Sequence, residues 1–161
     1  MTALPDIRVG SGFDVHAYDE SAPLHLAGLL WPGEPGLSGH SDGDAVCHAI
    51  VDALLSAAGL GDIGGLVGVD EPATEGAAST GFVRLALAKL AADGFRPVNV
   101  TVQVVGNRPK FSPRRDEAQR VMSELVGAPV SLSATTTDKL GFTGRGEGLA
   151  AIATALIARA V

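Results

Sequence analysis

The chain has 161 residues, a length that fits one compact domain, so we expect a single domain over residues 1–161. Hydrophobic residues make up 46% of the sequence and aromatic residues only 4%, which excludes a disordered or fibrous protein and predicts a core of aliphatic side chains. The net charge of -6 argues against a nucleic-acid-binding protein, because such proteins neutralise phosphates with lysine and arginine.

The N-terminal part of the chain predicts a strand and a hairpin. Apolar residues alternate loosely over 7–16, and Gly10 and Gly12 indicate that another segment approaches this strand closely. Residues 24–30 then predict a short hairpin arm, which ends in a turn at 31–36.

Two helices are predicted next. The SDGD segment at 41–44 offers N-cap chemistry, and the apolar residues after it recur at spacings of three and four as far as Gly59. A second helix is predicted over 79–92, because apolar residues again mark a face for burial and Gly94 follows its end.

The C-terminal half predicts two further strands and a third helix. Residues 98–104 alternate between valine and polar residues, which is the period of a half-buried strand. A helix is predicted from Ser112 to Gly127, and residues 130–134 alternate again. The closing run over 149–157 is apolar on every face and fits either a helix or a buried strand.

In this order the elements predict a mixed α/β fold of the α+β type, with a mixed four-stranded sheet covered by helices and a small additional hairpin. No apolar run approaches the about 20 residues that a membrane helix needs, and the N-terminus lacks a signal or transit pattern. We therefore expect a soluble, unprocessed chain. The single cysteine, Cys47, cannot form an internal disulfide, which fits a reducing cytoplasm, and it is expected to be small core filler.

Three side chains predict a metal site. Asp14 and His16 are two residues apart, so on a strand both side chains point to the same face. His48 lies in the middle of the first predicted helix, where Asp44 or Asp52, four residues away on the same stripe, could orient its imidazole.

Two histidines and one carboxylate leave a coordination position open, as a catalytic zinc site requires. Iron(II), manganese or cobalt would also fit this donor set. A partly exposed strand end and a hydrogen-bonded helix histidine explain the same residues without any metal. The spacing alone leaves both interpretations open.

A second cluster of polar groups follows the strand at 130–134. Residues 135–138 and 141–148 offer hydroxyls, backbone amides, an arginine and carboxylates, and hydroxyls and amides suit phosphate oxygens. An ordinary glycine-rich turn with solvated charges explains the same composition.

Two weaker signals come from single residues near predicted element ends. Asp62, in the GDIG segment at 61–64, could meet sugar hydroxyls, although such turns are usually structural. Lys110 follows a strand and could meet a phosphate as a point charge, although a basic residue at a strand end is more often only solvated.

Five blocks of sequence, taken together, resemble the 2-C-methyl-D-erythritol 2,4-cyclodiphosphate synthases, and the resemblance spans nearly the whole chain. The blocks are GFDVH at 12–16, GHSDGD at 39–44 with His48 after it, GDIG at 61–64, PK at 109–110, and ATTT at 134–137 with LGFTGRGEG at 140–148. Each block alone is unspecific, whereas five in this order and spacing are highly specific. The length fits the single-function enzyme, without a fused cytidylyltransferase domain.

The resemblance implies a lyase of the non-mevalonate (MEP) pathway of isoprene biosynthesis. In that reaction the 2-phosphate of 4-diphosphocytidyl-2-C-methyl-D-erythritol 2-phosphate attacks the β-phosphorus, closes a cyclic diphosphate and expels CMP. The resemblance also implies a cytoplasmic homotrimer, with the sheets facing the trimer axis and three active sites at subunit interfaces. The partners implied are the small-molecule substrate and other copies of the chain, with neither nucleic acid nor a membrane.

The resemblance assigns roles to residues of this chain by matching position. It implies Zn2+, or another divalent metal, at Asp14, His16 and His48. It implies Mg2+ or Mn2+ with the substrate diphosphate at Asp138, where the family has a glutamate. His40 and Thr136 match the positions that stabilise the transition state, which suits a mechanism made of positioning and charge stabilisation. The substrate-binding positions implied are Asp14, His16, His40, Ser41, Asp62, Ile63, Gly64, Gly106, Asn107, Arg108, Pro109, Lys110, Phe111, Ser112, Thr135, Thr136, Thr137, Asp138, Phe142 and Arg145.

The chain departs from the family's pattern at 67–72, where VGVDEP replaces the common F-P-D-x-D-P and puts substrate contacts from this loop in doubt. Two alternatives to a cyclase are kept, and the second of them would follow from a loss of turnover caused by this loop. A zinc phosphohydrolase would need a base to activate water, for which His40 and, less well placed, His25 are the candidates. A non-catalytic trimer that binds cytidine nucleotides or isoprenoid phosphates would keep the fold and lack turnover.

Overall fold

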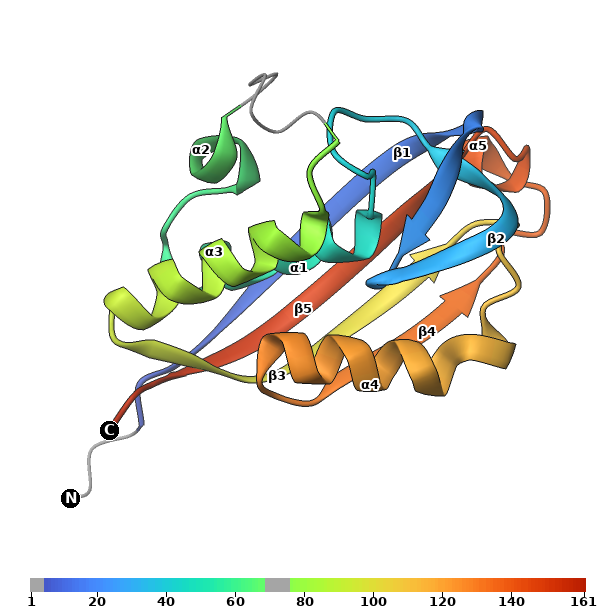
Figure 1. Ribbon diagram of the computed structural model, residues 1–161. Coiled ribbons are helices and arrows are strands. Elements are labelled where there is room, and N and C mark those ends of the chain that lie inside the picture. Colours follow the sequence, from blue (N-terminus) through green and yellow to red (C-terminus); the bar gives the residue numbers. More distant parts are fainter. Residues whose placement is uncertain (1–4, 69–75) are drawn as a thin grey trace.

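The computed structural model describes residues 5–68 and 76–161. In chain order, the elements of this part of the chain are β1 (Ile7–Leu26), β2 (Leu29–Leu37), α1 (Ala45–Ala58), α2 (Ile63–Val67), α3 (Ser79–Ala92), β3 (Phe95–Val105), the 3-10 helix η2 (Ser112–Arg114), α4 (Arg115–Val126), β4 (Val130–Thr135), α5 (Gly141–Gly144) and β5 (Gly148–Arg159). The three helices predicted from the sequence are confirmed as α1, α3 and α4 (Figure 1).

The strands form one five-stranded mixed sheet in the order β2-β1-β5-β3-β4. Only the β3–β4 pair is parallel among the pairs described. The predicted mixed α/β fold is confirmed, but the sheet has five strands where the sequence predicted four and a separate hairpin. The difference arises because β1 runs for 20 residues, so that residues 7–17 pair with β5 and residues 18–26 pair with β2 in the same sheet.

The position of the hairpin turn also differs from the prediction. The chain reverses at Ala27 and Gly28, both of which have a positive φ, between Leu26 and Leu29. Residues 31–36, predicted as the turn, lie instead within β2. Their prolines and glycines are accommodated because β2 is an edge strand, and its pairing with β1 is interrupted by register shifts.

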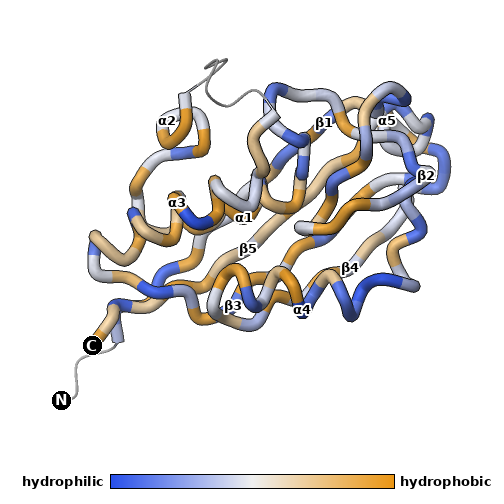
Figure 2. The backbone as a smooth tube through the Cα atoms, in the orientation of Figure 1, coloured by the Kyte–Doolittle hydropathy of each residue, from blue (hydrophilic) through white to orange (hydrophobic). Residues whose placement is uncertain are grey.

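The helices cover one face of the sheet (Figure 1). Helix α1 packs directly against β1 and β5, α3 packs against α1, and α4 packs against β4. The ambiguous closing segment is the strand β5, which lies between β1 and β3 and is hydrophobic along most of its length (Figure 2). The outward side of β5 is also apolar, with Ile152 exposed and Leu156 half-buried, so the sequence lacks the apolar–polar alternation that marks a half-exposed strand.

Two glycines of β1 allow α1 to approach the sheet closely, as the sequence predicted. A Cβ at Gly10 would collide with the backbone of Ala53 and Ala57, and a Cβ at Gly12 would collide with the carbonyl oxygen of Ala49. Any side chain at either position would push α1 away from β1. These glycines therefore set the distance between the two elements that carry the predicted metal ligands.

The opposite face of the sheet exposes apolar side chains. Ile7, Val9, Phe13 and Val15 alternate along β1 and are between 40% and 67% exposed, and Ile152 of β5, which pairs with Phe13, is 44% exposed. Among the described residues, no helix is long and apolar enough to cross a membrane.

Candidate metal centre and adjoining pocket

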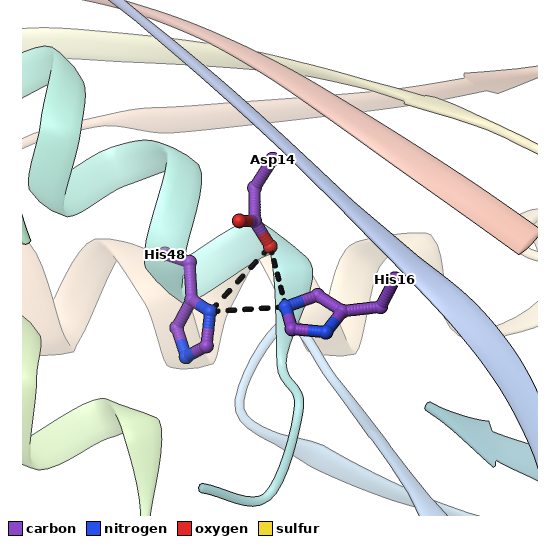
Figure 3. A group of neighbouring side chains, drawn as sticks. All are labelled: Asp14, His16 and His48. Carbon is purple, nitrogen blue, oxygen red and sulfur yellow. Dashed lines mark hydrogen bonds and ion pairs between the residues drawn. The ribbon is translucent and has the colours of Figure 1, made fainter. Parts of the chain in front are cut away.

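Asp14, His16 and His48 converge on one point, as the sequence predicted (Figure 3). The distance from Asp14 Oδ2 to His16 Nε2 is 2.8 Å, and the distance from Asp14 Oδ2 to His48 Nδ1 is 3.4 Å. The two ring nitrogens lie 3.2 Å apart. Within residues 5–68 and 76–161, this is the one group of three or more histidine, cysteine, aspartate or glutamate side chains that lie close enough to share a metal ion.

The fold brings these side chains together by a simple rule of register. Even-numbered residues of β1 face the helices, so Gly10 and Gly12 admit α1 while Asp14 and His16, further along the same face, point toward it. His48 is on the first turn of α1, the part of the helix nearest those two residues, and it is buried. The ligand set is therefore a consequence of how α1 docks on β1.

In each imidazole, the ring nitrogen that points away from Asp14 has a hydrogen-bond partner. His16 Nδ1 hydrogen-bonds the carbonyl oxygen of Ser38. His48 Nε2 lies 2.8 Å from Ser79 Oγ and 3.1 Å from Ser41 Oγ. In metal sites such contacts fix the tautomer, so that the inner nitrogen keeps its lone pair for the metal.

The predicted orientation of His48 by Asp44 or Asp52 is wrong. Asp44 caps α1 through the amide of Cys47 and also accepts hydrogen bonds from the amides of Ala27 and Gly28. Asp52 accepts from the amide of Ile63. Both carboxylates are occupied by backbone amides, because sharing a helix stripe with His48 does not make them neighbours of its ring.

The electrostatics of the triad favour a positive charge between its members. Burial would raise the pKa of Asp14, but hydrogen bonds from His16 and His48 outweigh it and lower that pKa. Burial would lower the pKa of His16, but the carboxylate of Asp14 outweighs it and raises that pKa. A half-buried anion beside two imidazoles is stabilised by a cation, and two nitrogens and one carboxylate oxygen suit a divalent metal such as zinc.

A pocket of about 450 Å3 brings together many of the predicted substrate-binding residues. It is lined by residues after β3 and at the end of β4, which are Gly106, Asn107, Pro109, Lys110, Phe111, Ser112, Ala134, Thr135 and Thr136. The two segments meet because β3 and β4 are parallel neighbours, so that both strands end at the same edge of the sheet. The structure thus joins the PK block and the ATTT block of the sequence.

Tyr18 links this pocket to the metal centre. Its hydroxyl donates a 2.7 Å hydrogen bond to the carbonyl oxygen of Arg108 and accepts one from the amide of the same residue. Tyr18 continues the even-numbered face of β1 two residues beyond His16. One strand therefore carries two metal ligands and holds the first segment of the pocket.

Other predicted residues lie outside both the triad and the pocket. Asp62 caps α2 by accepting from the amide of Gly65, as a structural turn would. The side chain of Arg108 pairs with Glu34, and that of Arg145 pairs with Glu147.

Three further predicted residues lie at the surface. Phe142 is partly exposed in the short helix α5. His40 is exposed in the loop between β2 and α1. Asp138 is exposed after β4, where its side chain accepts a 3.4 Å hydrogen bond from Thr136. The divergent loop at 67–72 lies mostly outside the described residues, which omit 69–75.

The sequence alone missed Ser38, Ser79 and Tyr18. Ser38 acts through its backbone carbonyl, and Ser79 is 31 residues from His48, so neither has a local signal. Tyr18 could have been found, because it continues the two-residue spacing of Asp14 and His16.

Known proteins resemble this chain over its length. The model of the YgbB family matches residues 7–158. The chain is 63% identical over 153 residues to the bifunctional enzyme IspD/IspF of Clavibacter michiganensis subsp. michiganensis, which covers 95% of this chain and 37% of that enzyme. It is 56% identical over 155 residues to the 2-C-methyl-D-erythritol 2,4-cyclodiphosphate synthase of Cutibacterium acnes, covering 96% and 92% of the two chains.

A solved structure agrees with these relatives. The CDP complex of IspF from Plasmodium falciparum superposes with a TM-score of 0.83 at 28% identity, over 99% of this chain and 100% of that one. The resemblance inferred from five short blocks is thereby confirmed over the whole described fold. The family model matches residues 7–158, and the Cutibacterium acnes synthase is matched almost end to end, so this chain belongs to the YgbB family of 2-C-methyl-D-erythritol 2,4-cyclodiphosphate synthases.

Proposed function

We propose that this chain acts as a single synthase domain over residues 1–161 in the non-mevalonate isoprenoid pathway. It converts 4-diphosphocytidyl-2-C-methyl-D-erythritol 2-phosphate into 2-C-methyl-D-erythritol 2,4-cyclodiphosphate and CMP. The observation that carries the proposal is the convergence of Asp14, His16 and His48 in a member of the YgbB family.

The reaction is an intramolecular phosphoryl transfer in which the substrate supplies its own nucleophile. An oxygen of the 2-phosphate forms a bond to the β-phosphorus, and the bond from the β-phosphorus to the phosphate oxygen of CMP breaks, so no water is consumed. Such a transfer needs positioning and charge stabilisation more than covalent chemistry by the protein. A zinc ion at the triad supplies Lewis-acid stabilisation of a phosphate oxygen.

Residues around the triad and the pocket would orient the diphosphate. His40 lies in the loop that also carries Ser38 and Ser41, which contact the two histidine ligands. Thr136 lines the pocket and donates to Asp138. We assign to His40 and Thr136 the stabilisation of charge on the transferring group, and to Asp138 the binding of Mg2+ or Mn2+ that accompanies the diphosphate.

The pocket at the ends of β3 and β4 is our proposed site for the cytidine and its phosphates. It offers backbone groups from 106 to 112, the ammonium group of Lys110, and the hydroxyls of Thr135 and Thr136, which suit a base and phosphate oxygens. The Plasmodium falciparum relative is described as a CDP complex, which supports a cytidine nucleotide as the ligand. Asp62, Ile63 and Gly64, and the pair Phe142 and Arg145, are assigned to further substrate contacts.

The uncovered face of the sheet supports a homotrimer. Ile7, Val9, Phe13, Val15 and Ile152 form an apolar surface that water would otherwise contact, and such a surface marks an interaction site. We propose that three chains pack these faces toward a common axis and that the active sites lie at the subunit interfaces.

A cytoplasmic location is proposed as well. Cys47 is buried, and burial raises the pKa of its thiol well above the ordinary value, so that the thiol stays protonated and inert. A lone buried thiol as core filler is typical of proteins in a reducing compartment.

Product analysis tests the function. The purified protein with Zn2+ and Mg2+ is expected to convert the diphosphocytidyl substrate into CMP and the cyclic diphosphate in a one-to-one ratio. The two products are measured by 31P NMR. Linear phosphates in place of the cycle would indicate a phosphohydrolase. Saturable CDP binding with no product of either kind would indicate a non-catalytic binding protein.

A further inference from the structure

The outer side of the metal centre contains a buried serine whose role follows from counting protons. Ser79 is the first residue of α3 and is fully buried. Its Oγ lies 2.8 Å from His48 Nε2 and also donates a hydrogen bond to Asp42 Oδ1. Its amide donates a 3.0 Å hydrogen bond to the other carboxylate oxygen, Asp42 Oδ2.

A serine hydroxyl has one proton, so Ser79 can donate only once. The carboxylate of Asp42 can only accept, and a charged acceptor attracts the proton more strongly than Ser41 Oγ, which lies 3.3 Å from Ser79 Oγ. Ser79 therefore donates to Asp42 and must accept from His48. The proton on His48 then resides on Nε2, and Nδ1 keeps a lone pair that faces Asp14 and His16.

Asp42 is itself held in place. Its Oδ1 accepts a 3.1 Å hydrogen bond from the amide of Asp44, and its own amide donates to the carbonyl oxygen of Ala77. The contacts therefore join the loop before α1 to the start of α3. Helix α3 has no side-chain N-cap, so its tie to Asp42 fixes the end that presents Ser79.

We propose that Asp42 and Ser79 form a hydrogen-bonded relay that positions His48 as a metal ligand, with Nε2 protonated and Nδ1 free to bind the ion. This inference rests on the metal centre of the proposed function and adds two positioning residues to it. The relay also holds the His48 ring in the orientation that the metal needs, because its Nε2 is tied to Ser79.

Metal binding tests the relay independently of turnover. Chelator-stripped protein is titrated with Co2+, whose visible absorption reports the coordination geometry, and the Zn2+ affinity is obtained by competition. Ser79→Ala is expected to weaken metal binding by about 10- to 100-fold, the range for loss of such outer contacts. Ser79→Thr keeps the hydroxyl and is expected to restore most of the affinity and the wild-type spectrum.

Ser123→Ala is the matched control. Ser123 Oγ accepts a 2.9 Å hydrogen bond from the amide of Val130, so its loss also removes a serine contact between two elements, without touching His48. This variant is expected to bind Co2+ as the wild type does. If Ser79→Ala fails to fold by circular dichroism, Asp42→Asn replaces it, because it removes the charge while keeping the shape of the side chain.

The outcomes separate this inference from the proposed function. Wild-type Co2+ affinity and spectrum in a folded Ser79→Ala variant, or in Asp42→Asn where that variant is used, would overturn the relay and leave the cyclase untouched. A wild-type protein that binds Co2+ and forms no cyclic product would overturn the cyclase and leave the relay. Equal loss of affinity in Ser79→Ala and Ser79→Thr would also overturn the relay, because the hydroxyl would then not matter.

Discussion

The metal centre and the pocket after β3 and β4 are built in opposite ways. The centre consists of side chains on a strand and a helix, and its three ligands are between 10% and 21% exposed. The pocket consists of strand ends and loops, where Lys110, Thr135 and Thr136 are exposed. The difference teaches that one chain assembles the metal ligands by itself, whereas the pocket leaves its side chains open to a ligand or, in the proposed trimer, to a second subunit.

The largest effect is expected at the centre itself. His48→Ala removes one of two nitrogen ligands, so we expect loss of bound metal and of CMP release, with the trimer retained because the apolar sheet face does not include His48. Metal analysis measures the bound metal, and size-exclusion chromatography measures whether the trimer is retained. His25→Ala, in the β1–β2 hairpin outside the triad, is the control and should retain its metal. Monomers in the His48→Ala sample would contradict the division between centre and interface.

The docking of α1 on β1 should be nearly as sensitive. Gly12→Ala places a Cβ against the Ala49 carbonyl oxygen, so α1 must move away from Asp14 and His16. Overpacking typically costs about 1–3 kcal/mol, and we expect the upper end of that range because the obstacle is backbone. Thermal unfolding measures the loss.

Gly81→Ala provides the comparison for that variant. Gly81 lies within α3 with open space around its Cβ position and an ordinary helical φ, so alanine should be neutral or stabilise by up to about 1 kcal/mol. Equal melting temperatures for Gly12→Ala and the wild type would show that the close approach of α1 does not matter.

A smaller effect is expected where the two regions meet. Tyr18→Phe removes the hydroxyl that holds the Arg108 backbone while keeping the ring. A net hydrogen bond contributes about 1 kcal/mol, so CDP binding should weaken by roughly fivefold while the metal content stays unchanged. Isothermal titration calorimetry with CDP measures the change. Loss of metal together with CDP affinity would mean that the centre and the pocket are not separable.

Much of the fold could be predicted because the local signals agreed with the tertiary structure. Helix α1 combines the predicted capping segment at 41–44, a regular apolar spacing and the terminal Gly59, and all three are realised, with Asp44 as the cap. Strand β5 could not be distinguished from a helix, because its uncovered face also carries apolar residues such as Ile152 and Leu156, so its sequence shows no apolar–polar alternation. Most of the second half of β1 was not predicted as a strand for another reason, because its polar residues belong to an irregular pairing with β2.

In the candidate site, too, the residues with a local sequence signal could be predicted and those that depend on the docking of separate elements could not. Asp14 and His16 followed from strand periodicity, whereas the grouping of His48 with them became specific only through the resemblance, because no local pattern states which helix docks on which strand. The partners of the imidazoles could not be predicted for the same reason. Ser79 reaches His48 from the start of a separate helix, and the Asp44 and Asp52 chosen by helical spacing turn out to bind backbone amides.

The most direct measurement is CMP release as a function of zinc bound per chain. Protein stripped with a chelator and kept in Mg2+ is reloaded with increasing Zn2+, and bound zinc and CMP are measured on the same samples. The account predicts no release from the stripped protein and a linear recovery that ends at one zinc per chain. Full CMP release from zinc-free protein, or zinc binding that restores none, would contradict the assignment of Asp14, His16 and His48 as the metal centre of the reaction.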